Sequence, residues 1–187
     1  MDALLTTFVA VALAEWGDKT QLVVAALAAR RGKPVLILLG LLFAALASNL
    51  VAAYAGAYVN DGIAIRAMTL LAALALLFGG VAGLFRRKAP SLGSGRAPLL
   101  VTAFFLCLAA EFGDRSQFFT FALSARFDSA ALAAAGATAG IMVAAVPAIL
   151  LGDRLQKALP LSAIRLSVAG LFLVAGFITA MKALQLA

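Results

Sequence analysis

The chain has 187 residues, of which 65% are hydrophobic and only 12% charged, and its mean hydropathy is +1.09. Soluble domains are about 45–50% apolar and about 25% charged, so this composition excludes a soluble globular fold, a coiled coil and a disordered chain. The formal net charge is +7, and in a membrane protein such an excess belongs to cytoplasmic loops rather than to a nucleic-acid interface. We therefore expect an all-α polytopic membrane protein that is surrounded by the lipid bilayer.

Apolar runs bounded by Gly, Pro and charged residues predict the transmembrane helices. Because one crossing takes about 20 apolar residues, the chain has room for about six spans and no further soluble domain. The predicted spans are residues 3–29, 34–59, 63–85, 98–125, 129–152 and 160–186. The long linker at residues 86–98 is basic and rich in Pro, Gly and Ser, and it divides the single transmembrane domain, residues 1–187, into nearly equal halves.

The two halves are related by an internal repeat with an offset of 96 residues (110 − 14). Residues 14–21, AEWGDKTQ, match residues 110–117, AEFGDRSQ. Each repeat, residues 1–88 and 97–187, holds three predicted spans. Because three is an odd number, the repeats must insert with opposite orientations, which is the inverted-repeat design of many secondary transporters.

The distribution of Lys and Arg predicts the orientation of the chain. One side of the membrane would hold Arg30, Arg31, Lys33, Arg86, Arg87, Lys88, Arg96, Arg154 and Lys157, with Arg165 near it, and the other side Arg66, Arg126 and Lys182. By the positive-inside rule the first side is cytoplasmic. Both termini then lie outside, which in a bacterium is the periplasm.

Both repeats place a charged motif near the middle of the membrane. Each copy carries two acids and a base: Glu15, Asp18 and Lys19 in the first, and Glu111, Asp114 and Arg115 in the second. The glutamates lie about 18–20 Å deep at 1.5 Å per residue, and helical spacing puts the members of each copy on one face. A charged residue at that depth costs about 2.5–3.5 kcal/mol on insertion scales, so six of them indicate a function rather than a need of the fold.

Small and neutral polar residues accompany the charges. Gly17 and Gly113 lack a side chain at the crowded point, which permits either close helix approach or a local break in the helix. Neutral oxygen atoms that could bind a cation, or support one from a second layer, come from Thr20, Gln21, Asn49, Ser116 and Gln117. Asn49 is matched by Ala145 in the second repeat, so any ligand at that place comes from one half only.

The charges and the ligand types predict the substrate. Four acids and two bases leave a formal charge of −2, which suits one divalent cation or two protons. Lys19 and Arg115 are expected to balance charge rather than to bind the ion, because cations repel one another. Oxygen ligands, in a chain without histidine, favour the hard cations Mg²⁺, Ca²⁺ and Mn²⁺ as transported substrates, with no prosthetic group.

The two copies, EWGDKT and EFGDRS, both fit the signature E-x-G-D-(K/R)-(T/S). In this the chain resembles the family of calcium/manganese cation–proton exchangers, which has Golgi, chloroplast and bacterial manganese-exporting members. The resemblance covers the whole chain, and its compact length resembles that of a bacterial, inner-membrane member. It implies that the four acids bind Mn²⁺ or Ca²⁺ and exchange it for protons, with export as the direction.

The residues alone leave other interpretations open. The four acids could form only buried ion pairs with Lys19 and Arg115, although this would leave two acids uncompensated. Thr20 and Ser116 could donate back to a carbonyl one turn earlier instead of binding a cation. The alternative functions are a six-span exporter of amino acids or other small solutes, a passive channel, and an intramembrane enzyme that uses carboxylates. A homo-oligomer is compatible with the sequence but is not indicated by it.

Overall fold

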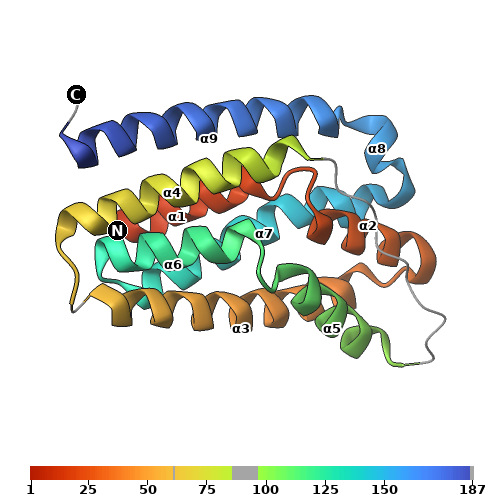
Figure 1. Cartoon of the computed structure of the whole chain (residues 1–187). Coiled ribbons are helices and arrows are strands. Elements are labelled where there is room, and N and C mark those ends of the chain that lie inside the picture. Colours follow the sequence, from red (N-terminus) through yellow and green to blue (C-terminus); the bar gives the residue numbers. More distant parts are fainter. Residues whose placement is uncertain (61, 86–96, 186–187) are drawn as a thin grey trace.

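The computed structural model describes residues 1–60, 62–85 and 97–185, and the regular elements in these ranges are helical (Figure 1). In chain order they are α1 (Asp2–Ala14), α2 (Lys19–Arg31), α3 (Pro34–Asn60), α4 (Ile65–Leu84), α5 (Leu99–Glu111), α6 (Arg115–Phe127), α7 (Ala130–Leu151), the 3-10 turn η1 (Gly152–Arg154), α8 (Leu155–Ala158) and α9 (Leu161–Leu184). Most of the predicted linker, residues 86–96, lies outside the described residues.

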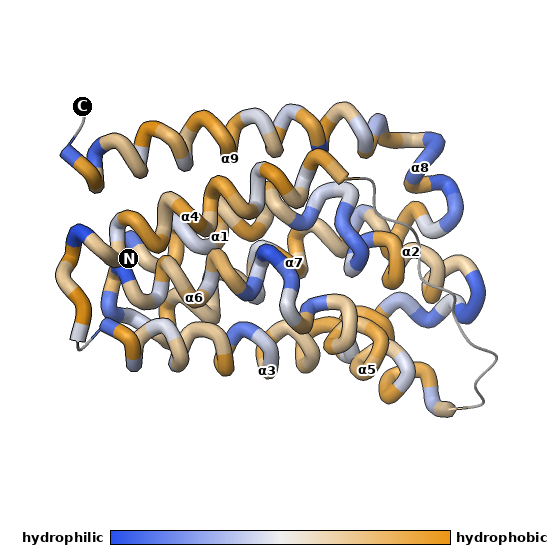
Figure 2. The backbone as a smooth tube through the Cα atoms, in the orientation of Figure 1, coloured by the Kyte–Doolittle hydropathy of each residue, from blue (hydrophilic) through white to orange (hydrophobic). Residues whose placement is uncertain are grey.

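The outer surface of the bundle is apolar. Large side chains such as Phe43, Phe105, Val174 and Phe177 are at least half exposed, whereas charged and hydroxyl side chains are buried inside. Figure 2 shows hydrophilic segments at the two ends of the bundle and at a few places in its middle. Four helices are long and apolar enough to cross a bilayer: α3, α4, α7 with its extension to Ala158, and α9. An apolar exterior suits lipid, and the chain is an all-α integral membrane protein, as predicted.

The boundaries of the four long helices lie within two residues of the predicted spans. Proline explains two of the starts, because its fixed φ suits a helix N-terminus: Pro34 is the first residue of α3, and Pro160 precedes α9. Gly152 ends α7 with a φ of 48°, a conformation that glycine adopts without a steric penalty.

The predicted spans 3–29 and 98–125 do not form continuous helices. The first is interrupted between α1 and α2 at residues 15–18, and the second between α5 and α6 at residues 112–114. Gly17 and Gly113 have φ values of 74° and 71°, in the left-handed region that favours glycine. Both glycines thus lie at a local break in the helix, and Gly17 is in addition closely approached by α9. The expectation that each motif lies on one face of a continuous helix is wrong because of this break.

Glycines join helices that come from different halves of the chain. Gly40 on α3 meets the Leu100 carbonyl of α5, and Gly136 on α7 meets the Leu4 carbonyl of α1, so closely that an added Cβ atom would overlap. The two contacts are equivalent, because Gly136 lies 96 residues after Gly40 and Leu100 lies 96 residues after Leu4. A second seam, between α4 and α9, repeats the relation: Gly80 with Leu173, and Gly176 with Leu77.

The turns divide between the two ends of the bundle (Figure 1). The N-terminus, the α3–α4 turn, the α6–α7 turn and the end of α9 lie at one end. The α2–α3 turn and α8 lie at the opposite end. The helix breaks lie between these ends, in the interior of the bundle.

Candidate functional site

The two helix breaks meet inside the bundle, and their charged side chains pair across the halves. Arg115 Nη2 donates to Asp18 Oδ1 at 3.1 Å, and Lys19 Nζ lies 3.4 Å from Asp114 Oδ1. Asp18 and Asp114 are the N-cap residues of α2 and α6. Each base therefore contacts the aspartate of the other motif, which the helical spacing within one motif could not predict.

The two ion pairs differ in burial. The Asp18 and Arg115 side chains are only 1% and 2% exposed, whereas the Lys19 side chain is 33% exposed beside a buried Asp114. The Lys19 ammonium also lies 3.4 Å from the Ala110 carbonyl. Lys19 is therefore partly accessible from outside the protein, while Arg115 is enclosed by it.

The two buried glutamates have different hydrogen-bond partners. Glu111 accepts from the Thr20 hydroxyl at 2.6 Å and from the Ser116 hydroxyl at 2.9 Å. Among the described residues, Glu15 Oε1 has no hydrogen-bond partner. Thr20 and Ser116 thus donate to a carboxylate rather than to a carbonyl one turn earlier, and both donate to the same one. Although the two motifs have nearly the same sequence, both carboxylate oxygens of Glu111 accept a hydrogen bond, whereas Glu15 Oε1 accepts none from the described residues.

Gln21 and Gln117 hold the breaks in place. Their Oε1 atoms accept from the N–H groups of Gly17 and Gly113, each at 2.8 Å. Their amide nitrogens anchor to the neighbouring long helices, Gln21 on the Ala144 carbonyl and Gln117 on the Ser48 hydroxyl. The oxygen that could serve as a ligand is thus occupied in this arrangement by a backbone donor.

Asn49 belongs to a buried polar network on the side of the second repeat. Its Oδ1 accepts from the Thr120 hydroxyl at 3.1 Å, and its Nδ2 donates to the Thr138 hydroxyl at 3.3 Å. The same Thr120 hydroxyl lies 2.8 Å from the carbonyl of Ser116, so its single proton is shared between two acceptors. Ser116 is the residue whose own hydroxyl donates to Glu111. Asn49 therefore supports the second motif through α6 rather than contacting the carboxylates directly.

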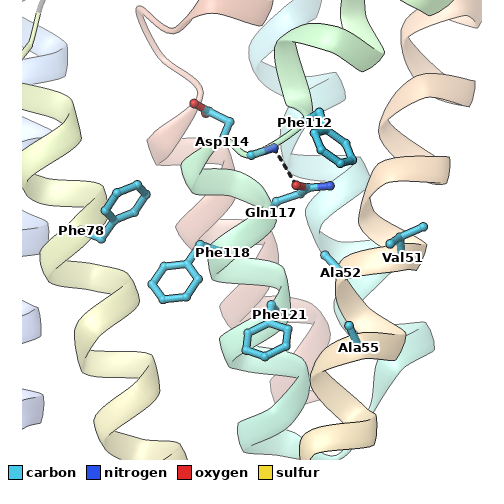
Figure 3. Close-up of a pocket in the computed structure, with 10 residues that line it drawn as sticks. Val51, Ala52, Ala55, Phe78, Phe112, Asp114, Gln117, Phe118 and Phe121 are labelled. Carbon is cyan, nitrogen blue, oxygen red and sulfur yellow. Dashed lines mark hydrogen bonds between the residues drawn. The ribbon is translucent and has the colours of Figure 1, made fainter.

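The two breaks also differ in what covers them. An added Cβ atom at Gly17 would lie 3.3 Å from the Leu161 carbonyl and 3.5 Å from Arg165 Cβ, both on α9, whereas nothing lies within 4 Å at Gly113. A cavity of about 520 Å³ opens beside the second motif, lined by Asp114, Gln117, Phe112, Phe118, Phe121, Phe78 and residues of α3. Figure 3 shows Asp114 at one end of this cavity, with Phe118 and Phe121 farther along α6.

The predicted acids share one region but do not yet form a closed ligand shell. Within the described ranges, no three Asp, Glu or Cys side chains are grouped closely enough to hold a metal ion. Each aspartate faces a base instead.

Two comparisons with known proteins place the chain. A family model described as "Divalent cation/proton antiporter GDT1" matches it twice, over residues 3–91 and 99–187. The chain is also 34% identical over 183 residues to a protein of Vibrio cholerae serotype O1 named "Putative manganese exporter", which covers 96% of this chain and 91% of that protein. The chain belongs to the GDT1 family of divalent cation/proton antiporters. No solved structure matches it.

Membership of the GDT1 family confirms the resemblance based on the duplicated motif. The protein is a divalent cation transporter rather than an enzyme, so the alternative of an intramembrane enzyme is wrong. Ion transport through a membrane follows from the same matches.

Sequence reasoning about this GDT1-family chain missed the burial of several polar side chains, among them Thr120, Thr138 and Arg165. Comparison of the halves at the offset of 96 could have found them. Thr120 and Thr138 stand opposite the apolar Val24 and Leu42, and Arg165 stands opposite Thr69. A polar residue opposite an apolar one, or a charged residue opposite a neutral one, indicates a place where the two halves do different work.

Proposed function

We propose that this transporter exchanges Mn²⁺ or Ca²⁺ for protons and moves the cation out of the cell. The observation that carries the proposal is the meeting of two buried motifs, which brings the carboxylates of Glu15, Asp18, Glu111 and Asp114 into one region with two bases. The description of the matching family and the name of the Vibrio relative support a divalent cation as substrate and export as the direction.

The proposed architecture is six spans in two inverted repeats, residues 1–88 and 97–187, within one transmembrane domain. In this arrangement α1 with α2 forms the first span and α5 with α6 the fourth. The seams between α3 and α5 and between α7 and α1 support it, because they use equivalent residues of the two halves. The two matches of one family model support it as well.

The proposed orientation places both termini in the periplasm of a bacterial inner membrane. The described cations at the α2–α3 turn and at α8, Arg30, Arg31, Lys33, Arg154 and Lys157, would then be cytoplasmic. This is the distribution that the positive-inside rule requires.

The order of ligand exchange follows from the two ion pairs. A cation that enters from the cavity meets Asp114 first, since this residue lies at the cavity and its partner Lys19 is partly exposed. The Asp18–Arg115 pair lies deeper and would open later. Carboxylate oxygens are the ligands that Mn²⁺ and Ca²⁺ share.

The charge of the site determines the coupling. Four acids and two bases carry −2, so one divalent cation or two protons give the site the same net charge. Alternating exposure of either form then moves no net charge through the membrane. Exchange of one cation for two protons should follow a pH gradient and be nearly indifferent to voltage.

The test is cation uptake by proteoliposomes under imposed gradients. Mn²⁺ and Ca²⁺ should accumulate against their gradients when a pH gradient is present, whereas Mg²⁺ and Zn²⁺ serve as comparison substrates. Nigericin, which collapses the pH gradient, should stop the uphill movement, and a potential clamp with valinomycin and K⁺ should leave it unchanged. Uphill movement that responds to voltage and not to pH would show a uniporter or channel instead.

A further inference from the structure

Arg165 is a buried cation that the proposed exchange does not use. It lies in the second turn of α9 and is 9% exposed. Its Nε has no hydrogen-bond partner among the described residues. Arginine keeps its charge at every physiological pH, so this guanidinium is a permanent positive charge inside the protein.

The position of Arg165 is next to the first motif. Gly17 lies between Glu15 and Asp18 in the sequence. A Cβ atom added to Gly17 would lie 3.5 Å from the Cβ of Arg165. Leu161, one turn earlier on α9, covers the same glycine with its carbonyl. Leu161 and Arg165 lie in the first two turns of α9, and the start of α9 lies at the end of the bundle that carries α8 and the α2–α3 turn (Figure 1).

The second motif has no such cover. The residue equivalent to Arg165 is Thr69, whose hydroxyl is engaged by the Ile65 carbonyl at 2.9 Å, and Gly113 has open space around it. The cavity beside Asp114 extends along α6 to Phe121 and along α3 to Ala55, toward the end that carries the termini. The second motif, which lacks the extra cation, thus borders a cavity, and the first motif is covered by α9.

We propose that Arg165 closes the route between the carboxylates and the α8 end of the bundle to divalent cations. The proposal rests on the exchange function proposed above. A fixed positive charge in a narrow, poorly hydrated passage repels a divalent cation more strongly than it would in water. Positively charged side chains exclude cations from membrane pores in the same way. A metal ion passes this place only when α9 moves away from Gly17.

The first test compares three variants in proteoliposomes loaded with Mn²⁺. Arg165→Gln should raise the leak of Mn²⁺ in the absence of a pH gradient at least tenfold, because the passage loses its charge but keeps a polar side chain. Arg165→Lys keeps the charge and should stay as tight as the wild type. Arg66→Gln removes an exposed arginine at the start of α4 and serves as the matched control.

The wild type in the same assay separates this proposal from the exchange function. If wild-type protein accumulates Mn²⁺ under a pH gradient and Arg165→Gln remains equally tight and coupled, the gate is wrong and the exchange stands. If the wild type shows no proton-driven uptake, the exchange function itself fails.

The second test keeps Arg165 in place, so it does not depend on whether the Gln variant folds. Trp16 adjoins Gly17 and is partly buried, and the chain's own cysteine, Cys107, is fully buried. A cationic thiol reagent added from the α8 side should modify Trp16→Cys no faster than it modifies Cys107. Rapid modification in the chain that retains Arg165 would overturn the proposal, whatever the leak measurements give.

Discussion

The two motifs have nearly the same sequence but different surroundings. In the first, Glu15 lacks a partner for Oε1 among the described residues, the aspartate is paired with a fully buried arginine, and α9 covers the glycine. In the second, Glu111 has two hydroxyl donors, the aspartate is paired with a partly exposed lysine, and the glycine faces open space. The motif sets the local break, and the neighbouring helices set the access.

The source of the difference is the packing of the flanking helices. α4 packs against α6, beside the second motif, while α9 places its first two turns over Gly17. The hydrogen bonds add to this difference. The Thr20 hydroxyl donates to Glu111 of the second motif, although Glu15 belongs to the same motif as Thr20. A symmetric arrangement would give each glutamate one hydroxyl donor. The observed one concentrates both donors on the open side.

Removal of the two glutamate charges should have the largest effect. Glu15→Gln and Glu111→Gln should each lower proton-driven Mn²⁺ uptake by at least about 100-fold, since each removes one negative charge and one proton site from the interior. Loss of a buried charge eases membrane insertion, so both variants should reach the membrane. Uptake is compared with that of Asp153→Asn, an exposed acid in η1. Near-normal uptake in both glutamine variants would exclude this site.

Neutralising the two aspartates one at a time should lower the stability of the protein by different amounts. Asp18→Asn removes the hydrogen-bonded carboxylate from the fully buried Arg115, and breaking a buried pair costs about 3–5 kcal/mol. Asp114→Asn removes the carboxylate beside Lys19, whose side chain is 33% exposed, so its loss should cost less. Thermal unfolding in detergent should therefore show a much lower midpoint for Asp18→Asn. Equal midpoints would mean that burial does not distinguish the pairs.

Removal of Lys19 should make transport sensitive to voltage. Lys19→Gln leaves the site at −3, so one divalent cation and two protons no longer make it neutral. An uncompensated charge costs about 2.3 kcal/mol per 100 mV of membrane potential. Uptake by this variant should change with a valinomycin–K⁺ potential that leaves the wild type unaffected, or the metal should stay bound and turnover stop. A variant that turns over without voltage dependence would contradict the charge count.

The smallest effect should come from the two glycines. Gly17→Ala and Gly113→Ala both force alanine into a left-handed conformation, which costs about 1–3 kcal/mol. Only the first also brings a Cβ to 3.3 Å from the Leu161 carbonyl. Gly17→Ala should therefore unfold at the lower temperature in the same detergent assay. The opposite order would show that α9 does not hold Gly17 closely.

Much of the fold follows from local sequence signals, and much of the site does not. Pro34, Pro160 and Gly152 fix helix ends because their backbone preferences act locally, so the long spans are predicted within two residues. Gly17 and Gly113 predicted either a local break in the helix or the close approach of another helix, and the sequence alone could not say which.

The contacts across the halves are beyond sequence reasoning. Arg115 reaches Asp18 and Thr20 reaches Glu111 only because both breaks turn their chains toward a shared interior. Arg165 was assigned to one side of the membrane by its charge, and its burial against Gly17 depends on how α9 packs. Partner choice between distant segments carries no signal in a single sequence.

The cross-paired breaks have a consequence for the order of synthesis. The first motif leaves the ribosome 96 residues ahead of the second (111 − 15), which at about 5–20 residues per second is a delay of about 5–20 s. During that time Asp18 has no Arg115 and Thr20 has no Glu111, and α1, at 13 residues and about 20 Å, is too short to cross the membrane alone. The first repeat therefore lacks these partners until the second repeat has been synthesised.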